Sequence, residues 1–201
     1  MDKTSYALGM SIAHNMMQSG VTEIVFDDFA AAIKAAFAGE KPALSYEEAG
    51  DVLNKFFEKV EKEQAAVMAD VAAKMKEEGE AFLKVNSSKE GVVTLKSGLQ
   101  YKVLKKGAGK KPGPADKVKC HYEGTLVDGS KFDSSYDRNE PAVFGVNQVI
   151  PGWTEALQLM SEGSAWELYI PYQLAYGEAG AHGAIPPCAA LIFKVELLEV
   201  L

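Results

Sequence analysis

Cysteine and histidine are scarce in this chain. Among 201 residues there are only two cysteines, Cys120 and Cys188, and three histidines, all too scattered for the ligand spacing of a metal site. The sequence therefore predicts no disulfide framework, no metal and no cofactor. A reducing compartment fits this cysteine usage best.

The chain also lacks long hydrophobic runs and an excess of positive charge. No run approaches the ~20 apolar residues of a membrane-spanning helix, and residues 1–20 alternate polar with apolar side chains instead of forming a targeting segment. The net charge of −7 argues against nucleic acid or an anionic lipid surface as the main partner. We expect a cytoplasmic protein without nucleic-acid binding or membrane insertion; the alternative is the periplasm or outer surface, if a leader has been removed.

The composition divides the chain into two halves. Residues 1–90 carry 10 Lys and Arg against 16 Asp and Glu, whereas residues 91–201 carry 11 against 12. The first half is rich in Ala, Glu, Lys and Met, and proline and glycine gather in the second. We therefore expect a helical domain over 1–90 and a β-rich domain over 91–201.

Three helices are predicted in the first half. Apolar residues recur at helical spacing over residues 5–19, and Gly20 is placed to end that helix. Asp27 is a candidate N-cap for a second helix through Phe37, which Gly39 closes. A third begins at the serine-x-x-glutamate capping box of residues 45–48 and runs about 40 residues, to about residue 86.

The third helix is too long for a small domain to cover. Two explanations of its first part remain: the apolar stripe packs on the first two helices, or the helices share a core with a second subunit. We prefer the shared core, because two short helices cannot bury Phe29, Phe37, Phe56 and Phe57 alone. From Val60 onward, i,i+4 charge pairs can support a solvated stalk. The stripe consists of Ala49, Leu53, Phe56, Val60, Gln64, Val67, Val71 and Met75.

Short β-like runs follow in the second half, at 99–104, 118–127, 131–134, 165–171 and 190–201. Asp128-Gly129 is a strong hairpin signal, and residues 153–160 form one short helix entered through Pro151. The long loop 172–189 is of a length that is usually functional or disordered. The predicted fold class is α+β: an all-α N-terminal domain with a long stalk helix, then antiparallel strands wrapped around one short helix.

Five ordered motifs carry a specific resemblance. They are VKCHYEG at 118–124, GSKFDSS at 129–135, VIPGW at 149–153, LAYG at 174–177 and IPP at 185–187. Their order and spacing resemble the FKBP-type peptidyl-prolyl isomerases, over about residues 97–201. SYALG at 5–9 and the long helix are similar to the macrophage infectivity potentiator subfamily, which implies an N-terminal dimerisation domain and a homodimer.

The resemblance implies an apolar pocket for a proline ring. Trp153 forms its floor, the Ile150 N–H and the Tyr176 hydroxyl bond substrate carbonyls, and Asp133 supplies a polar edge; with Phe132 these are the implied catalytic residues. Asp133 could instead, or in addition, cap the serines that follow it. Ala142 departs from a common aromatic position near one wall. The implied lining is Tyr122, Phe132, Asp133, Phe144, Val149, Ile150, Trp153, Tyr176, Ile185 and Phe193.

The implied function is peptidyl-prolyl cis-trans isomerisation with chaperone activity. Rotation about an X-Pro bond breaks no covalent bond, so no nucleophile is required. The adjacent Cys120 and His121 face opposite sides of a strand and are not a catalytic pair. Implied partners are proline-containing or unfolded client proteins and a rapamycin-type macrolide. The alternative is a non-catalytic module or holdase that recognises proline.

Overall fold

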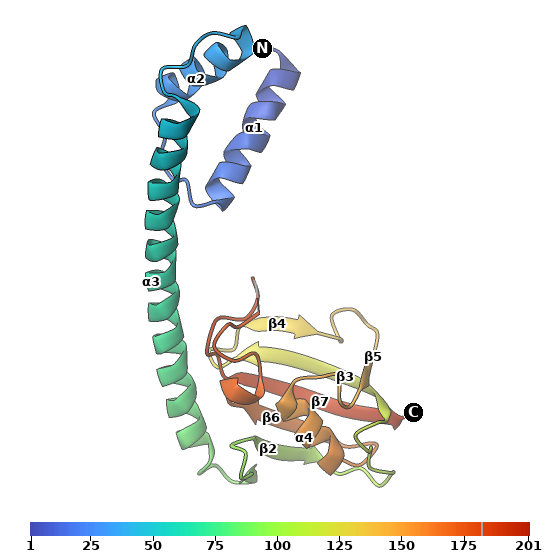
Figure 1. The fold of residues 1–201 in the computed structure, drawn as a ribbon. Coiled ribbons are helices and arrows are strands. Elements are labelled where there is room, and N and C mark those ends of the chain that lie inside the picture. The colour runs from blue at the N-terminus through green and yellow to red at the C-terminus, as the bar shows by residue number, and fades with distance from the viewer. Residues whose placement is uncertain (182) are drawn as a thin grey trace. The chain divides into compact units, whose positions relative to one another are not determined.

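The computed structural model describes residues 1–181 and 183–201 (Figure 1). The chain forms two compact units, Met1–Val67 and Met68–Leu201, and the division falls inside one helix. This division lies upstream of the expected domain boundary at residue 90. Each unit is described by itself.

The first unit contains two short helices, α1 (Lys3–Gln18) and α2 (Phe26–Ala38). The Asp2 carboxylate caps α1 by accepting a hydrogen bond from the backbone N–H of Ser5. The expected N-cap of α2 is wrong: α2 begins after Val25 without a side-chain cap, and Asp27 lies in its first turn, where a carboxylate suits the helix dipole. Gly39 ends α2 in the left-handed conformation, as predicted.

The long helix α3 spans Tyr46–Asn86, 41 residues. Its capping box is confirmed: the Glu48 carboxylate accepts from the Ser45 N–H at 2.8 Å, and the Ser45 hydroxyl accepts from the Glu48 N–H at 3.2 Å. Within the first unit, α3 packs against the end of α1 at Gly20, where a Cβ would lie 2.4 Å from Val60 Cγ1. No residue of Met1–Val67 is buried.

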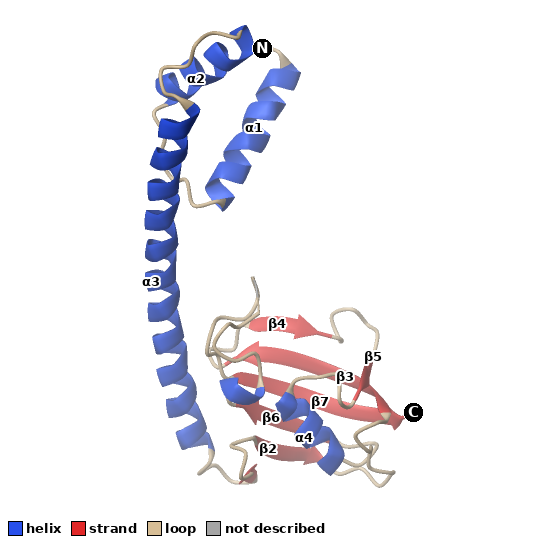
Figure 2. Ribbon diagram, in the orientation of Figure 1, coloured by secondary structure: helices blue, strands red, loops and turns tan. Residues whose placement is uncertain are grey.

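The second unit is built on an antiparallel sheet (Figure 2). The strand order is β1-β2-β6-β7-β3-β4, and β5 pairs with the free part of β3. The five predicted strands are confirmed within a residue or two, but the short β1 and β5 were missed. The strands are β1 (Val92–Thr94), β2 (Gln100–Lys105), β3 (Lys117–Leu126), β4 (Lys131–Ser134), β5 (Ala142–Gly145), β6 (Ala165–Ile170) and β7 (Leu191–Val200).

One short helix, α4 (Pro151–Leu159), covers a face of this sheet (Figure 2). Pro151 at its first turn fits a position whose N–H needs no helical partner. Trp153, Ala156 and Leu157 of α4 are buried against alternate residues of β3, β6 and β7, and together they form the core. A single 3-10 turn, η1 (Tyr172–Leu174), follows β6. The predicted α+β architecture is confirmed.

The last turns of α3 belong to the second unit and are not a solvated stalk. Gly79 and Asn86 are buried, and the Asn86 amide donates to Gln100 Oε1 at 3.0 Å. The ring of Phe82 lies 6.0 Å from that of Tyr169 on β6. The expectation of solvation therefore fails where α3 meets the sheet, because residues 71–86 turn one face toward it.

Candidate functional site

The candidate site is a pocket of about 420 Å³ between the sheet and α4. The strands alternate, so Tyr122 on β3, Phe144 on β5 and Phe193 on β7 all point to the inner face. Nine of the ten residues implied by the resemblance line it together; Ile185 does not, and Gln148 joins them. The lining is Tyr122, Phe132, Asp133, Phe144, Gln148, Val149, Ile150, Trp153, Tyr176 and Phe193.

Trp153 occupies the centre of this aromatic group. Its ring meets those of Tyr122, Phe144 and Phe193 nearly edge to face, with centroid distances of 5.4, 5.6 and 5.3 Å. Such edge-to-face contacts fix the orientation of each ring. Only 4% of Trp153 is exposed, so the surrounding residues enclose nearly the whole indole, which lines the pocket.

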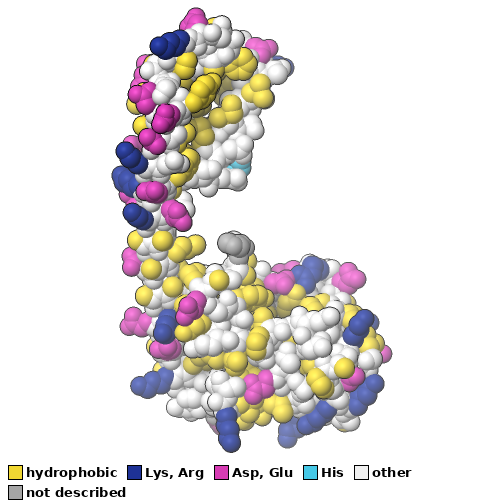
Figure 3. All heavy atoms as spheres, in the orientation of Figure 1, with side chains coloured by type: hydrophobic (Ala, Val, Ile, Leu, Met, Phe, Trp, Pro, Cys, Tyr) yellow, Lys and Arg dark blue, Asp and Glu magenta, His cyan; other side chains and the backbone are white. Residues whose placement is uncertain are grey.

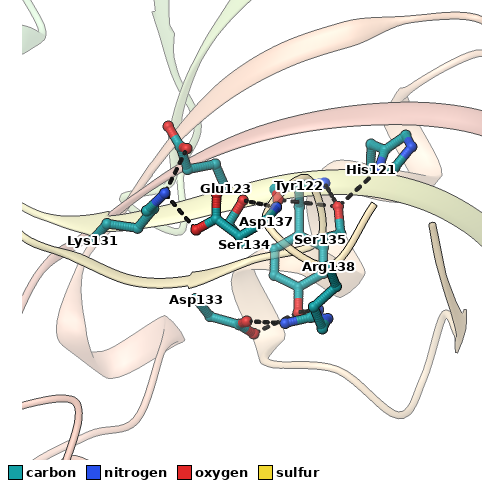
Figure 4. A network of polar contacts seen from close by, with 9 residues as sticks. All are labelled: His121, Tyr122, Glu123, Lys131, Asp133, Ser134, Ser135, Asp137 and Arg138. Carbon is teal, nitrogen blue, oxygen red and sulfur yellow. Dashed lines mark hydrogen bonds and ion pairs between the residues drawn. The ribbon is translucent and has the colours of Figure 1, made fainter. Parts of the chain in front are cut away.

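A polar network forms one edge of the pocket (Figure 4). The Tyr122 hydroxyl donates to Asp133 Oδ2 at 2.5 Å, and Arg138 donates to Asp133 Oδ1 at 2.5 Å and to the Tyr122 oxygen at 2.8 Å. Burial opposes ionisation of Asp133, but these hydrogen bonds outweigh it and lower the pKa of the carboxyl. Asp133 is therefore a fixed anion, held by two side chains.

Two hydrogen-bond donors flank the pocket. Tyr176 lies on the loop after η1, and burial together with the charge of Asp133 raises the pKa of its hydroxyl, which keeps it protonated. Ile150 is the N-cap of α4, so its backbone N–H stands outside the hydrogen bonds of the helix. An apolar floor, a fixed carboxylate and two neutral donors suit a polar but uncharged substrate such as a peptide.

Comparison with known proteins assigns the family. The family model for FKBP-type peptidyl-prolyl cis-trans isomerases matches residues 108–198, and that for the domain amino terminal to this isomerase matches residues 1–103. The chain belongs to the FKBP-type peptidyl-prolyl cis-trans isomerases. The resemblance drawn from the five motifs is confirmed, and with it the activity.

Relatives match this FKBP-type chain over its whole length. The outer membrane protein MIP of Legionella longbeachae is 44% identical over 199 residues, 99% of this chain and 85% of that protein. The FKBP-type 22 kDa peptidyl-prolyl cis-trans isomerase of Escherichia coli K12 is 43% identical, over 99% and 95%. The crystal structure of FkpA from E. coli aligns with a TM-score of 0.74 at 38% identity, covering 98% of this chain and 95% of that one.

Two residues singled out by the FKBP resemblance lie outside the pocket lining. Ile185 is buried and bridges to Ala181, in a separate groove that it shares with Pro186 and Pro187. Ala142 lies at the start of β5 opposite Cys120, and Phe144 supplies the wall on that strand. The alanine at position 142 therefore opens no gap in the pocket lining.

Arg138 belongs to the polar network but was not among the residues predicted from the sequence. This residue is the only arginine in the chain, and it follows Asp133 by five residues in the loop after β4. A guanidinium can bond two acceptors at once, as it does here with Asp133 and Tyr122. Its uniqueness in the composition was the available signal.

Cys120 and His121 do not line this FKBP pocket. Cys120 is fully buried in the core, and burial raises the pKa of its thiol to about 12. His121 faces the other side of β3, where it stacks on Tyr136 and lies 2.9 Å from Ser135 Oγ (Figure 4). Over residues 1–181 and 183–201 no acidic, histidine or cysteine side chains gather in a metal-binding group, and no helix has the length and hydropathy to cross a membrane.

Proposed function

We propose that this pocket catalyses rotation about X-Pro bonds by holding the proline ring against Trp153. The observation that carries the proposal is the convergence of the implied residues from five separate elements on one aromatic pocket. A proline ring matches such an apolar floor in shape and polarity. The polar edge formed by Asp133, Tyr122 and Arg138 lies on one side of the pocket, so it can orient the peptide backbone that flanks the proline.

Catalysis then requires only differential binding. The planar amide must lose its resonance at a barrier of ~18–20 kcal/mol, and no proton has to move. The Ile150 N–H and the Tyr176 hydroxyl donate to substrate carbonyl oxygens, and the pocket holds the proline ring while the carbonyl that precedes it rotates. A dry pocket favours the twisted amide, which has less charge separation than the planar one.

The test is the rate of cis-trans exchange of a proline tetrapeptide, measured by NMR with the full chain. Tyr176→Phe and Asp133→Leu should each slow the exchange about tenfold, the value of one good hydrogen bond in the transition state. Tyr46→Phe is the matched control, because Tyr46 is 90% exposed in the first unit. Rapamycin should compete for the pocket. Full activity in both site variants would exclude the proposed roles.

We further propose that residues 1–67 form a homodimer. Apolar side chains crowd the surface of α1, α2 and the first half of α3 (Figure 3), and Phe26, Phe37 and Tyr46 are at least three-quarters exposed. A monomer rarely leaves so large an apolar area in water. Light scattering at micromolar concentration should give about twice the 21.7 kDa chain mass. A mass equal to that of one chain would refute the dimer.

From these two proposals we expect the protein to bind unfolded or proline-containing client proteins. A dimer presents two pockets to one unfolded chain, which supports chaperone activity through a second point of attachment. One relative is named an outer membrane protein. That name gives the cytoplasmic expectation no support, and it favours the alternative of the periplasm or outer surface. Fractionation of the native organism, followed by immunodetection, distinguishes these locations.

A further inference from the structure

A close contact joins α3 to the segment that precedes β7. Gly79 is buried, and a Cβ placed on it would lie 2.9 Å from Ala190 Cβ and 3.5 Å from Ala190 N. Gly50, in the same helix, has nothing within 4 Å of the same added atom. A side chain would therefore collide with a neighbour at Gly79 but not at Gly50.

The segment touched by Gly79 is the return arm of the long loop, residues 186–190. Ala189 and Ala190 are each only 5% exposed. Met75, one turn before Gly79, lines a small groove with Pro186, Ala189 and Ala190. The return arm thus lies between α3 on one side and the core on the other, and its position depends on how closely α3 approaches.

The return arm is tied directly to the segment that carries Tyr176. The Cys188 N–H donates to the carbonyl oxygen of Gly177 at 3.1 Å, and the Gly177 N–H donates to the carbonyl oxygen of Tyr172 at 2.9 Å. Cys188 has a φ of 56°, a left-handed conformation that is uncommon for a side chain of this kind. A backbone held in this way cannot shift at Ala190 without moving Cys188 and the residue after Tyr176.

We propose that Gly79 is a positioning residue for the isomerase site. By letting α3 approach Ala190 closely, it sets the return arm, and through the Cys188–Gly177 hydrogen bond it fixes Tyr176 at the pocket. The proposal rests on the role of Tyr176 proposed above. It extends the functional unit to a helix that lines no part of the pocket.

The test compares four full-length variants: Gly79→Ala, Gly50→Ala, Ala190→Gly, and the exchange of both contact residues, Gly79→Ala with Ala190→Gly. The first two add the same methyl group to the same helix and gain the same helix propensity. Only the first brings the added methyl group to 2.9 Å from Ala190 Cβ in the return arm. The double variant keeps one methyl group at the contact but supplies it from the helix.

The readouts are kcat and KM for a proline tetrapeptide, the amide NMR shifts of Gly177 and Cys188, and the melting temperature. For Gly79→Ala we expect kcat to fall about threefold or more with a smaller change in KM, because small misplacements at a site are costly. Both amide signals should shift. The double variant should recover most of the rate, and Gly50→Ala should match the parent chain.

The proposal is overturned if Gly79→Ala retains the parent kcat and both amide positions, or if its only change is in melting temperature. Should Gly79→Ala fail to fold, Ala190→Gly carries the test: loss of the methyl loosens the arm, and unchanged amides and kcat overturn the proposal. An inactive parent chain would instead refute the proposed function. The amide shifts would still report whether the contact sets the arm.

Discussion

The two units of the chain treat their apolar side chains in opposite ways. In the second unit the nine residues of α4 bury Trp153, Ala156 and Leu157 completely or almost so. In the first unit the sixteen residues of α1 bury none, although its apolar positions also recur at helical spacing. Amphipathic sequence alone therefore does not create a core; something must cover the apolar side.

That contrast separates what each unit can do alone. The second unit closes a sheet around α4 and supplies its own cover, so its pocket is complete within one chain. The first unit is a set of helices whose apolar side is open to water. The dimer proposed above would cover this side and stabilise the unit, because short helices gain little from propensity without packing.

The largest difference should appear on shortening one leucine in each unit. Leu157→Ala removes a fully buried side chain and should lower the free energy of unfolding by ~2–5 kcal/mol. Leu53→Ala shortens a side chain that is 52% exposed and should cost less than about 0.5 kcal/mol while the chain is monomeric. Urea unfolding at a concentration where light scattering gives one chain measures both. Equal costs would break the comparison.

An intermediate effect on stability is expected when the second unit is produced as a fragment with or without the last turns of α3. A fragment of residues 68–201 keeps the contacts of Phe82 with Tyr169 and of Asn86 with Gln100, whereas a fragment of 91–201 loses them. The shorter fragment should melt several degrees lower, since ~1 kcal/mol corresponds to ~4–8 °C in a small domain. Calorimetry of the two fragments measures this.

The same two fragments test the first unit. The 68–201 fragment should turn over a tetrapeptide like the full chain, whereas the 91–201 fragment, which lacks Gly79, should turn it over more slowly. Both should accelerate the proline-limited refolding of a denatured protein less than the full chain does, because the client loses its second attachment. Equal melting temperatures of the two fragments would show that residues 68–90 do not stabilise the second unit and act only as a stalk. Undiminished refolding activity would leave the first unit without a part in catalysis on proteins.

The smallest effect concerns pH. The pKa of Asp133 is lowered from 3.8 in the folded chain, so its ionisation contributes stability that is present above the unfolded pKa and lost as pH falls through the folded pKa. Arg138→Gln removes one of the bonds that lower it, and the loss should begin at higher pH. Because both side chains are about half exposed, the gain is screened and small.

Carboxyl NMR titration of Asp133 follows this change. Asp137→Asn is the matched control, because Asp137 pairs with Lys131 on the other side of the strand (Figure 4). An unchanged titration in Arg138→Gln would show that Arg138 does not hold the carboxylate.

Features with strong local causes were predictable from the sequence. The capping box at Ser45 and Glu48 uses residues three apart, and the hairpin at Gly129 requires the positive φ of 88° that it adopts. The long strands alternate clearly because each has one buried face. The pocket residues could be grouped only through the resemblance, since they come from elements far apart in the chain.

Features that depend on distant partners were not predictable. The strands β1 and β5 are too short to show a period, and they form because β2 and β3 offer free edges. The packing of α3 on the sheet was missed because a glycine such as Gly79 in a helical sequence indicates low helix propensity. The need for a residue without a side chain becomes visible only from its close contact with Ala190.

The single arginine gives the chain a built-in chemical label. A dicarbonyl reagent selective for guanidinium groups has one target here, and the Arg138 side chain is 50% exposed at the pocket edge. Modification would therefore report on one place in the molecule without any engineered residue. The rate of labelling, read by mass spectrometry with and without a bound proline peptide, becomes a direct measure of pocket occupancy in a mixture of clients.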